Sequence, residues 1–313
     1  MGLGMLVDGK WRTKREQEDE KGSFVRPATT FRNQAIPETG RYHLYVSLAC
    51  PWAQRTLIMR KLKGLDDAIS LSIVDPHMGD DGWSFSEFPG CIPDSINNAQ
   101  FLRDIYVKAD PNFTGRVTVP VLWDKKEGTI VNNESREILR MFDTGFQEIA
   151  KNSISFYPEK LRDKIDQTID QIYQPINNGV YRAGFATTQE AYEEAVTDLF
   201  DALNSWEEVL GNQRYLCGNV ITEADWCMFT TLLRFDAVYY VHFKCNIRHL
   251  WDYPNLVNYL KDLSQQPGVK ETCNMDHIKI HYYTSHPNVN PSGIVPKGPV
   301  IDLGSPHDRG RFF

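Results

Sequence analysis

Cys50 is the residue whose type and position best suit covalent chemistry. It follows a short alternating apolar segment and precedes Pro51, a residue that suits the first position of a helix because its missing N–H is not needed there. A cysteine at a helix start faces unpaired N–H groups and the positive end of the helix dipole, and both lower the pKa of its thiol. The alternative is a small buried apolar side chain. The strand–Cys–Pro–helix order favours a reactive thiol.

The other cysteines lack this setting. The chain has six cysteines and no Cys-x-x-Cys pair. We interpret the remaining five as structural: Cys91, Cys217, Cys227, Cys245 and Cys273. Among them we expect Cys91, in a Pro/Gly-rich segment, to be the most exposed. Because Cys50 has no partner thiol in such a pair, a mixed disulfide formed there must be resolved by an external thiol.

Two later segments have residue types that can hold a peptide ligand. Val119-Pro120 opens an expected strand, where a proline cannot donate to the middle of a ladder and so marks an edge or a turn. Glu134-Ser135 begins an expected helix, whose first N–H groups can receive a carboxylate. Alone, Glu134-Ser135 would be an ordinary helix cap. Because the pair follows Cys50 and Val119-Pro120 along the chain, in this order, we favour a role in ligand binding.

The elements expected around these residues alternate between strand and helix. Strands are expected at 42–47 and 69–74, a hairpin at 117–123 and 129–131, and helices at 52–63, 99–109 and 134–142. Residues 75–98 form a long loop, and loops of that length are usually functional or disordered. The order of elements is that of a thioredoxin-like α/β domain.

After about residue 150 the pattern indicates helices only. Leu161, Ile165, Ile169, Ile172 and Ile176 form a helical stripe. Further helices are expected at 189–210, from the capping-box-like start at 222–225 to Tyr239, and at 254–265, with a tail from His281. The predicted fold class is therefore an α/β thioredoxin-like N-terminal domain plus an all-α C-terminal domain. The predicted division is an arm at 1–40, domains at 41–150 and 151–285, and a tail at 286–313.

Composition narrows the possible partners. The chain of 313 residues has 34 basic and 41 acidic side chains and a formal net charge of −7, with no basic block, which argues against nucleic acid and anionic membranes. We see no signal peptide and no apolar run of roughly 18 residues that would span a bilayer. With scattered cysteines read as reduced thiols, these features predict a cytoplasmic protein.

Several segments resemble one family closely. They are 47–55 (SLACPWAQR), 116–124 (RVTVPVLWD), 132–135 (NNES), 178–186 (NGVYRAGFA), 234–239 (RFDAVY) and 281–283 (HYY). They are similar to the Xi class of glutathione transferases, the glutathionyl-hydroquinone reductases, and the resemblance runs from about residue 5 to 300. It implies a homodimer in which a cysteine, here Cys50, takes glutathione from a glutathionyl-hydroquinone as a mixed disulfide that a second glutathione clears.

The resemblance also implies roles for individual residues. Glutathione would be bound by Trp83, Arg116, Val119, Glu134 and Ser135, with the Val119-Pro120 bond cis and the backbone of Val119 paired with the glutathione backbone. Trp83 would come from the long loop; by itself it could equally be a core residue.

Three tyrosines are the implied acid–base groups: Tyr181, Tyr239 and Tyr282. One would exchange a proton with the quinone ring, and the others would stabilise the thiolate. Read from the residues alone, each of the three is more simply a packed aromatic side chain, and Tyr283 is an alternative to Tyr282.

The alternatives keep the fold and change the chemistry. An Omega-like thiol transferase or dehydroascorbate reductase would use the same cysteine, and a non-enzymatic protein would bind aromatic ligands. A conjugating transferase is disfavoured because that type activates glutathione with Ser or Tyr. His277 and His281 have a spacing that zinc can use, but no cysteine or carboxylate cluster completes a site, so no metal is expected.

Overall fold

The computed structural model describes residues 4–13 and 22–312. Contacts between Cα atoms divide the chain into two units. Unit 1 contains 4–13, Pro27–Ile154 and Glu271–Val295, and unit 2 contains 22–26, Ser155–Lys270 and 296–312. The grouping of 271–295 with unit 1 differs from the division expected from the sequence, which stays a prediction.

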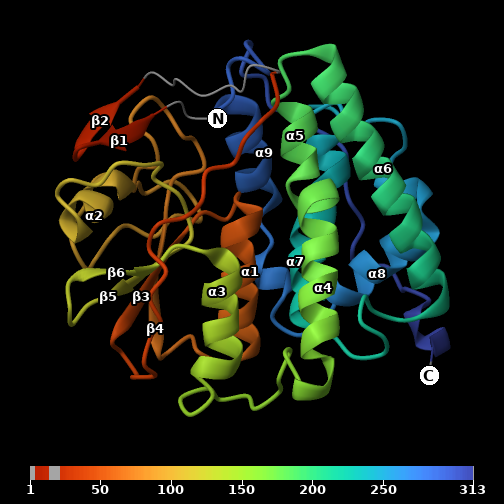
Figure 1. Cartoon of the computed structure of the whole chain (residues 1–313), viewed down its shortest axis with the longest axis horizontal. Helices are drawn as coiled ribbons and strands as arrows, with labels where there is room; N and C mark the ends of the chain where they lie inside the picture. The colour runs from red at the N-terminus through yellow and green to blue at the C-terminus, as the bar shows by residue number, and fades with distance from the viewer. Residues whose placement is uncertain (1–3, 14–21, 313) are drawn as a thin grey trace. The chain divides into compact units, whose positions relative to one another are not determined.

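Unit 1 is built on a four-stranded mixed sheet in the order β4-β3-β5-β6 (Figure 1). Its strands are β3 (Tyr42–Val46), β4 (Ile69–Ile73), β5 (Val121–Asp124) and β6 (Thr129–Asn132). β3 pairs parallel with β4 and antiparallel with β5, and β5 pairs antiparallel with β6. A parallel pair needs a crossover, which α1 (Pro51–Leu62) supplies; α2 (Leu102–Ala109) and α3 (Ser135–Arg140) complete the domain. This arrangement confirms the thioredoxin-like α/β fold.

The β5–β6 hairpin has the expected turn but a shorter first strand. Asp124 accepts hydrogen bonds from the backbone N–H groups of Lys126 and Glu127 at 2.9 and 3.1 Å, and Gly128 takes the positive φ of +65° that the turn requires. The ladder begins at Val121 rather than at Val117, because Pro120 has no N–H to donate.

A second small sheet lies in the segment expected to be an ordered arm or a tail. β1 (Met5–Val7) and β2 (Lys10–Arg12) pair antiparallel. Asp8 and Gly9 form the turn with φ of 48° and 72°, and an Asp-Gly turn between short strands is a known hairpin signal. Leu6 is buried and exchanges backbone hydrogen bonds of 3.0 and 2.9 Å with Gly115. The signal was present in the sequence but was missed.

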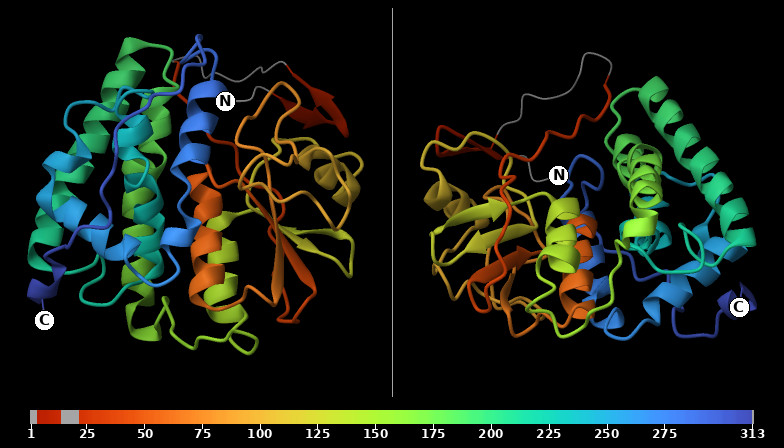
Figure 2. Two further views of the ribbon diagram at one scale, coloured as in Figure 1. Left: turned by 180° about the vertical axis from the view of Figure 1, so that it is seen from behind. Right: turned by 60° about the horizontal axis from the view of Figure 1, so that its bottom comes forward.

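Unit 2 is helical, as expected. Its α-helices are α4 (Arg162–Ile172), α5 (Gly179–Gly184), α6 (Gln189–Asn212), α7 (Glu223–Leu232) and α8 (Pro254–Ser264) (Figure 2). The capping box of α7 is present: Thr222 and Asp225 exchange the expected bonds, and the Tyr259 hydroxyl donates to Asp225 at 2.9 Å. All of α7 is buried, which explains why its sequence shows little polar face.

The helix α9 was not predicted from the sequence. The last helix was expected at 254–265 and the tail from His281, but α9 runs from Met275 to Thr284. Asn274 caps this helix by accepting a hydrogen bond from the N–H of His277 at 2.9 Å. Histidine and tyrosine have modest helix propensity, so the cap and the burial of the helix within unit 1 decide its structure. Within the described ranges, no helix has the length and apolarity needed to cross a membrane.

Candidate active site

Cys50 is the N-cap residue of α1. Its φ and ψ are −79° and 122°, and Pro51 occupies the first helical turn. The Cys50 carbonyl accepts the N–H of Gln54 at 3.0 Å, so the helix starts directly at the thiol. The side chain is partly exposed. The structure thus places Cys50 where the sequence predicted, at the positive end of a helix.

Sheet topology brings Val119 to this thiol. β5 runs antiparallel to β3, with Tyr45 opposite Val121, so the residues just before β5 lie beside the residues just after β3. Cys50 Sγ is 3.7 Å from the carbonyl oxygen of Val119. The Val119-Pro120 peptide bond is cis, as the resemblance implied. Arg116, in the same segment, is half-buried.

Glu134 and Ser135 form the start of α3. Glu134 is the N-cap, and its carboxylate accepts the N–H of Arg136 at 3.3 Å and the hydroxyl of Thr29 at 3.1 Å. The Ser135 hydroxyl is buried and lies 3.5 Å from the same carboxylate. These contacts are those of a helix cap, which was the simpler interpretation of the pair. Their role in ligand binding stays a prediction.

Trp83 lies in the long segment between β4 and α2. Its side chain is 6% exposed, and its indole ring stacks on the imidazole of His281 with centroids 4.7 Å apart and planes at 22°. Its backbone carbonyl accepts the N–H of Leu102 at 2.9 Å. The sequence pointed to Trp83 but gave no signal for its partner, because nothing in the sequence relates residue 83 to residue 281.

Tyr282 belongs to unit 1 with Cys50. It lies on α9 and is buried, with its ring centroid 5.2 Å from that of His281 and 5.6 Å from that of His286. Its neighbour Tyr283 is also buried, and desolvation raises the pKa of the Tyr283 hydroxyl to about 12. Because both side chains are buried, burial does not distinguish Tyr282 from Tyr283, and the assignment of Tyr282 stays a prediction.

Tyr181 and Tyr239 lie together in unit 2. Tyr181 is on α5, and Tyr239 ends a π-helical segment, Phe235–Tyr239. Their ring centroids are 6.0 Å apart with planes at 60°, and both side chains are buried. The guanidinium of Arg26 lies 4.7 Å from the Tyr181 ring centroid, and its Nε donates to Asn178 Oδ1 at 2.9 Å. No pattern in the sequence pointed to this contact between Arg26 and Tyr181.

The remaining cysteines differ from Cys50 in their surroundings. Cys217, Cys227 and Cys245 are buried, whereas Cys91 is partly exposed, a class it shares with Cys273. Desolvation raises the pKa of the thiols of Cys91, Cys217 and Cys245, which disfavours thiolate at these positions. All six are free thiols in the structure.

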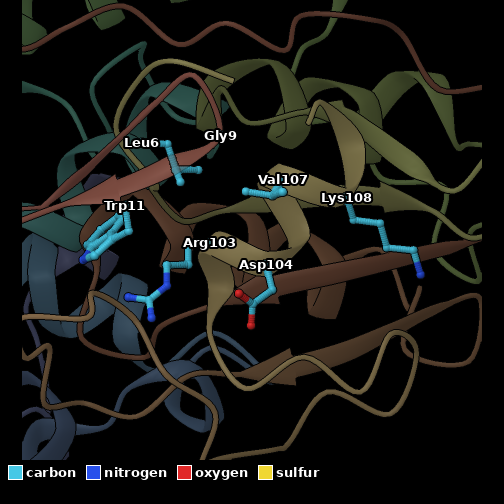
Figure 3. A pocket seen from close by; sticks show the side chains of 7 residues that line it. All are labelled: Leu6, Gly9, Trp11, Arg103, Asp104, Val107 and Lys108. Atoms are coloured by element: carbon cyan, nitrogen blue, oxygen red, sulfur yellow. The ribbon is translucent and has the colours of Figure 1, made fainter. Parts of the chain in front are cut away.

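In the described part of the chain, neither a metal cluster nor the pocket found in unit 1 adds to this site. Within residues 4–13 and 22–312, no three or more His, Cys, Asp or Glu side chains gather as a metal site would require. A pocket of about 390 Å³ opens between the β1–β2 hairpin and α2 (Figure 3). Its lining is Leu6, Gly9, Trp11, Arg103, Asp104, Val107 and Lys108, which includes none of the predicted site residues.

Comparison with protein families gives two matches. The model of the glutathione S-transferase N-terminal domain matches residues 49–144, and that of the C-terminal domain matches residues 189–262. The first range contains Cys50 and the Glu134-Ser135 pair, and the second contains Tyr239. The two matches correspond in order to the α/β and the helical parts of the chain.

Individual relatives narrow the class. The glutathionyl-hydroquinone reductase YqjG of Escherichia coli is 51% identical, with 99% of this chain and 100% of the relative covered. The glutathionyl-hydroquinone reductase PcpF of Sphingobium chlorophenolicum is 49% identical over 96% and 98%. A Schizosaccharomyces pombe protein, 47% identical over 90% and 95%, is named glutathione S-transferase omega-like 2.

Solved structures agree with these relatives. A Xi-class glutathione transferase from Natrialba magadii matches with a TM-score of 0.96 and 57% identity, covering 99% of this chain and 98% of that one. The glutathione-bound structure of YqjG matches with a TM-score of 0.88 and 52% identity, over 90% and 97%. The chain belongs to the glutathione S-transferase family, and within it to the Xi class, the glutathionyl-hydroquinone reductases.

Proposed function

We propose that this protein reduces glutathionyl-hydroquinones to hydroquinones with glutathione as co-substrate. The observation that carries the proposal is the position of Cys50, a thiol at the start of α1 beside the Val119 carbonyl, in a chain whose relatives are named for this reaction. A thiolate favoured by the helix start is the nucleophile that sulfur attack requires.

The reaction has two steps: the first forms a mixed disulfide on Cys50, and the second is a thiol–disulfide exchange that clears it. The Cys50 thiolate attacks the sulfur of the glutathionyl-hydroquinone, so that a sulfur–sulfur bond forms and the carbon–sulfur bond breaks. The ring keeps the electron pair of that bond and takes up a proton, which gives the hydroquinone. A second glutathione then attacks the glutathione sulfur of the mixed disulfide, releasing glutathione disulfide and the Cys50 thiolate. The hydroquinone ring gains two electrons and two glutathione molecules lose them.

Glutathione binding is assigned to unit 1. We assign it to Trp83, Arg116, Val119, Glu134 and Ser135. The backbone of Val119 would pair with the glutathione backbone, and the start of α3 would receive its carboxylate end. This assignment is supported by the 3.7 Å distance between Cys50 Sγ and the Val119 carbonyl, since the reacting sulfur of glutathione must reach the same thiol.

The proton is assigned to a tyrosine. Tyr181 would exchange a proton with the ring as it passes into its keto form, which weakens the carbon–sulfur bond. Tyr239 and Tyr282 would donate hydrogen bonds to the thiolate. Support comes from the burial of all three side chains and from the contact between the Tyr181 and Tyr239 rings, whose centroids are 6.0 Å apart.

The Omega-like reading is the second candidate. Its support is the name of the Schizosaccharomyces pombe relative and the fact that the same cysteine could reduce dehydroascorbate or mixed disulfides. A non-enzymatic role in binding aromatic ligands is the third candidate, and a measured turnover with glutathione would exclude it.

We further propose that the protein is a homodimer and that it acts in the cytoplasm, where glutathione is kept reduced. Sedimentation analysis tests the dimer, and fractionation tests the location.

A direct comparison of substrates tests the proposed function. Rates are measured with glutathionyl-hydroquinone and with dehydroascorbate at equal glutathione concentrations. We expect a kcat/KM at least about tenfold higher for the glutathionyl-hydroquinone, which corresponds to about 1.4 kcal/mol of transition-state discrimination. A preference for dehydroascorbate would support the Omega-like candidate instead.

A further inference from the structure

α9 meets the loop at residues 75–98 through two histidines on one face. His277 and His281 are four residues apart, so they lie one above the other. His277 Nε2 is 2.7 Å from the carbonyl oxygen of Pro89, and His281 Nδ1 is 3.0 Å from that of Pro76. The spacing that suggested a zinc site therefore serves to hold two points of the loop.

The next turn of the helix adds further contacts. Thr284 Oγ1 is 2.9 Å from Nδ1 of His77, and the N–H of Met78 donates to Ser285 Oγ at 2.9 Å. The start of the loop is therefore held at three consecutive residues, Pro76, His77 and Met78. Trp83 is carried between this anchored start and the anchor at Pro89.

The hydrogen bond of His281 determines the orientation of its ring. A carbonyl oxygen only accepts, so Nδ1 of His281 must carry the proton. An imidazole fixed in this way offers a flat surface, and the indole of Trp83 stacks on it at 4.7 Å and 22°. The Trp83 backbone is fixed separately, through its bond with the N–H of Leu102. The stack with His281 is therefore a contact that can orient the Trp83 side chain independently of its backbone.

We propose that His281 is a positioning residue that holds the Trp83 indole in place for glutathione binding. The proposal rests on the proposed function, in which Trp83 contacts glutathione. His281 acts through Trp83 and not on the substrate. Loss of the ring stack should weaken glutathione binding by about three- to tenfold, the scale of one aromatic pair.

Two substitutions at His281 separate the ring from the hydrogen bond. His281→Gln keeps an N–H donor for the Pro76 carbonyl and loses the ring, whereas His281→Phe keeps a ring and loses the donor. His277→Gln is the matched control, because it makes the same replacement of a ring by an amide at the Pro89 anchor, on the same helix, without touching Trp83. Melting temperatures of all three variants show how much each change affects stability alone.

The readouts are glutathione affinity by calorimetry and the fluorine NMR spectrum of protein labelled with 5-fluorotryptophan. The chain has seven tryptophans, and Trp83→Phe identifies the Trp83 signal. We expect His281→Gln to move this signal and to weaken glutathione binding, His281→Phe to retain most of both, and His277→Gln to change neither.

Two results would overturn the proposal. One is an unchanged Trp83 signal and affinity in His281→Gln, and the other is an equal change in His277→Gln, which would indicate general loosening of the loop. Failure of the underlying function is seen separately. If added glutathione does not move the Trp83 signal of the wild-type protein, the contact between Trp83 and glutathione is wrong, while the effect of His281 on the Trp83 signal is still measured.

Discussion

The thiol of Cys50 and the carbonyl oxygen of Val119 are 3.7 Å apart although 69 positions separate them in the chain. The antiparallel pairing of β3 with β5 brings them together. The predicted nucleophile and a backbone segment with a cis peptide bond thus meet at one end of the sheet. Any peptide thiol that pairs with the Val119 backbone would carry its sulfur close to Cys50.

Replacement of the nucleophile should remove turnover. Cys50→Ala should lower the reductase rate by at least about 10³-fold, because no other cysteine is the N-cap residue of an α-helix in the described part of the chain. Glutathione affinity, measured by calorimetry, should change little since the other predicted contacts remain. Cys91→Ala is the matched control and should keep wild-type activity. Comparable loss in the two variants would indicate that the Cys50 assignment is wrong.

Two tyrosines should affect the acidity of the thiol. We expect the pKa of Cys50 to lie below the usual value of about 8.5. Tyr239→Phe and Tyr282→Phe should each raise it, by about one pH unit, because a hydrogen bond to a charged group favours the charged form. The pH dependence of alkylation by iodoacetamide measures this pKa, with Tyr283→Phe as the comparison for Tyr282. A profile that moves in neither variant would remove both tyrosines from the mechanism.

Much of this arrangement could be predicted from the sequence because local signals define it. The Cys-Pro step marks the start of α1, Asp124 to Gly128 mark the hairpin turn, and the capping box marks the start of α7. Each is a backbone requirement met by neighbouring residues.

What could not be predicted depends on contacts distant in the sequence. α9 is rich in histidine and tyrosine, and its helix is stabilised by burial within unit 1 rather than by propensity. Trp83 stacks on His281, and Tyr181 contacts Arg26. In both pairs the partner comes from a segment far away in the chain. The β1–β2 hairpin is different: its Asp8-Gly9 turn was a local signal that was not used.

Tyr181 should act in one half-reaction only. If it exchanges a proton with the ring, Tyr181→Phe should slow the release of hydroquinone by about 10²–10⁴-fold, the usual contribution of a general acid–base group. Clearance of the mixed disulfide by glutathione involves no quinone and should stay near the wild-type rate. Rapid mixing measures the two steps separately. Equal slowing of both would mean that Tyr181 acts through the thiolate or through packing.

His43 should make stability depend on pH. It is fully buried on β3, between the hydroxyls of Ser70 and Ser72 at 2.7 and 2.9 Å, and desolvation lowers its pKa to about 4. The unfolded chain binds the proton near pH 6.5. The contribution of His43 to the free energy of unfolding is therefore fully present above pH 6.5 and is lost as the pH falls towards 4.

The effect can be isolated by removing the titrating group. Between pH 7.5 and pH 5 this histidine should account for about 2 kcal/mol of the fall in the free energy of unfolding. His43→Gln should lose that part of the pH dependence while keeping polar contacts. Urea unfolding at both pH values provides the comparison. The same slope in the variant and the wild type would contradict the assignment.

The most direct test of the reductase mechanism is a single turnover without added glutathione. Excess enzyme, fully reduced, is mixed with glutathionyl-hydroquinone; free hydroquinone is quantified and the protein is analysed by peptide mass spectrometry. The account predicts one hydroquinone released per substrate and one glutathione attached to the peptide that contains Cys50. Hydroquinone release that requires added glutathione, or an adduct on Cys91 or Cys273 in place of Cys50, would contradict it.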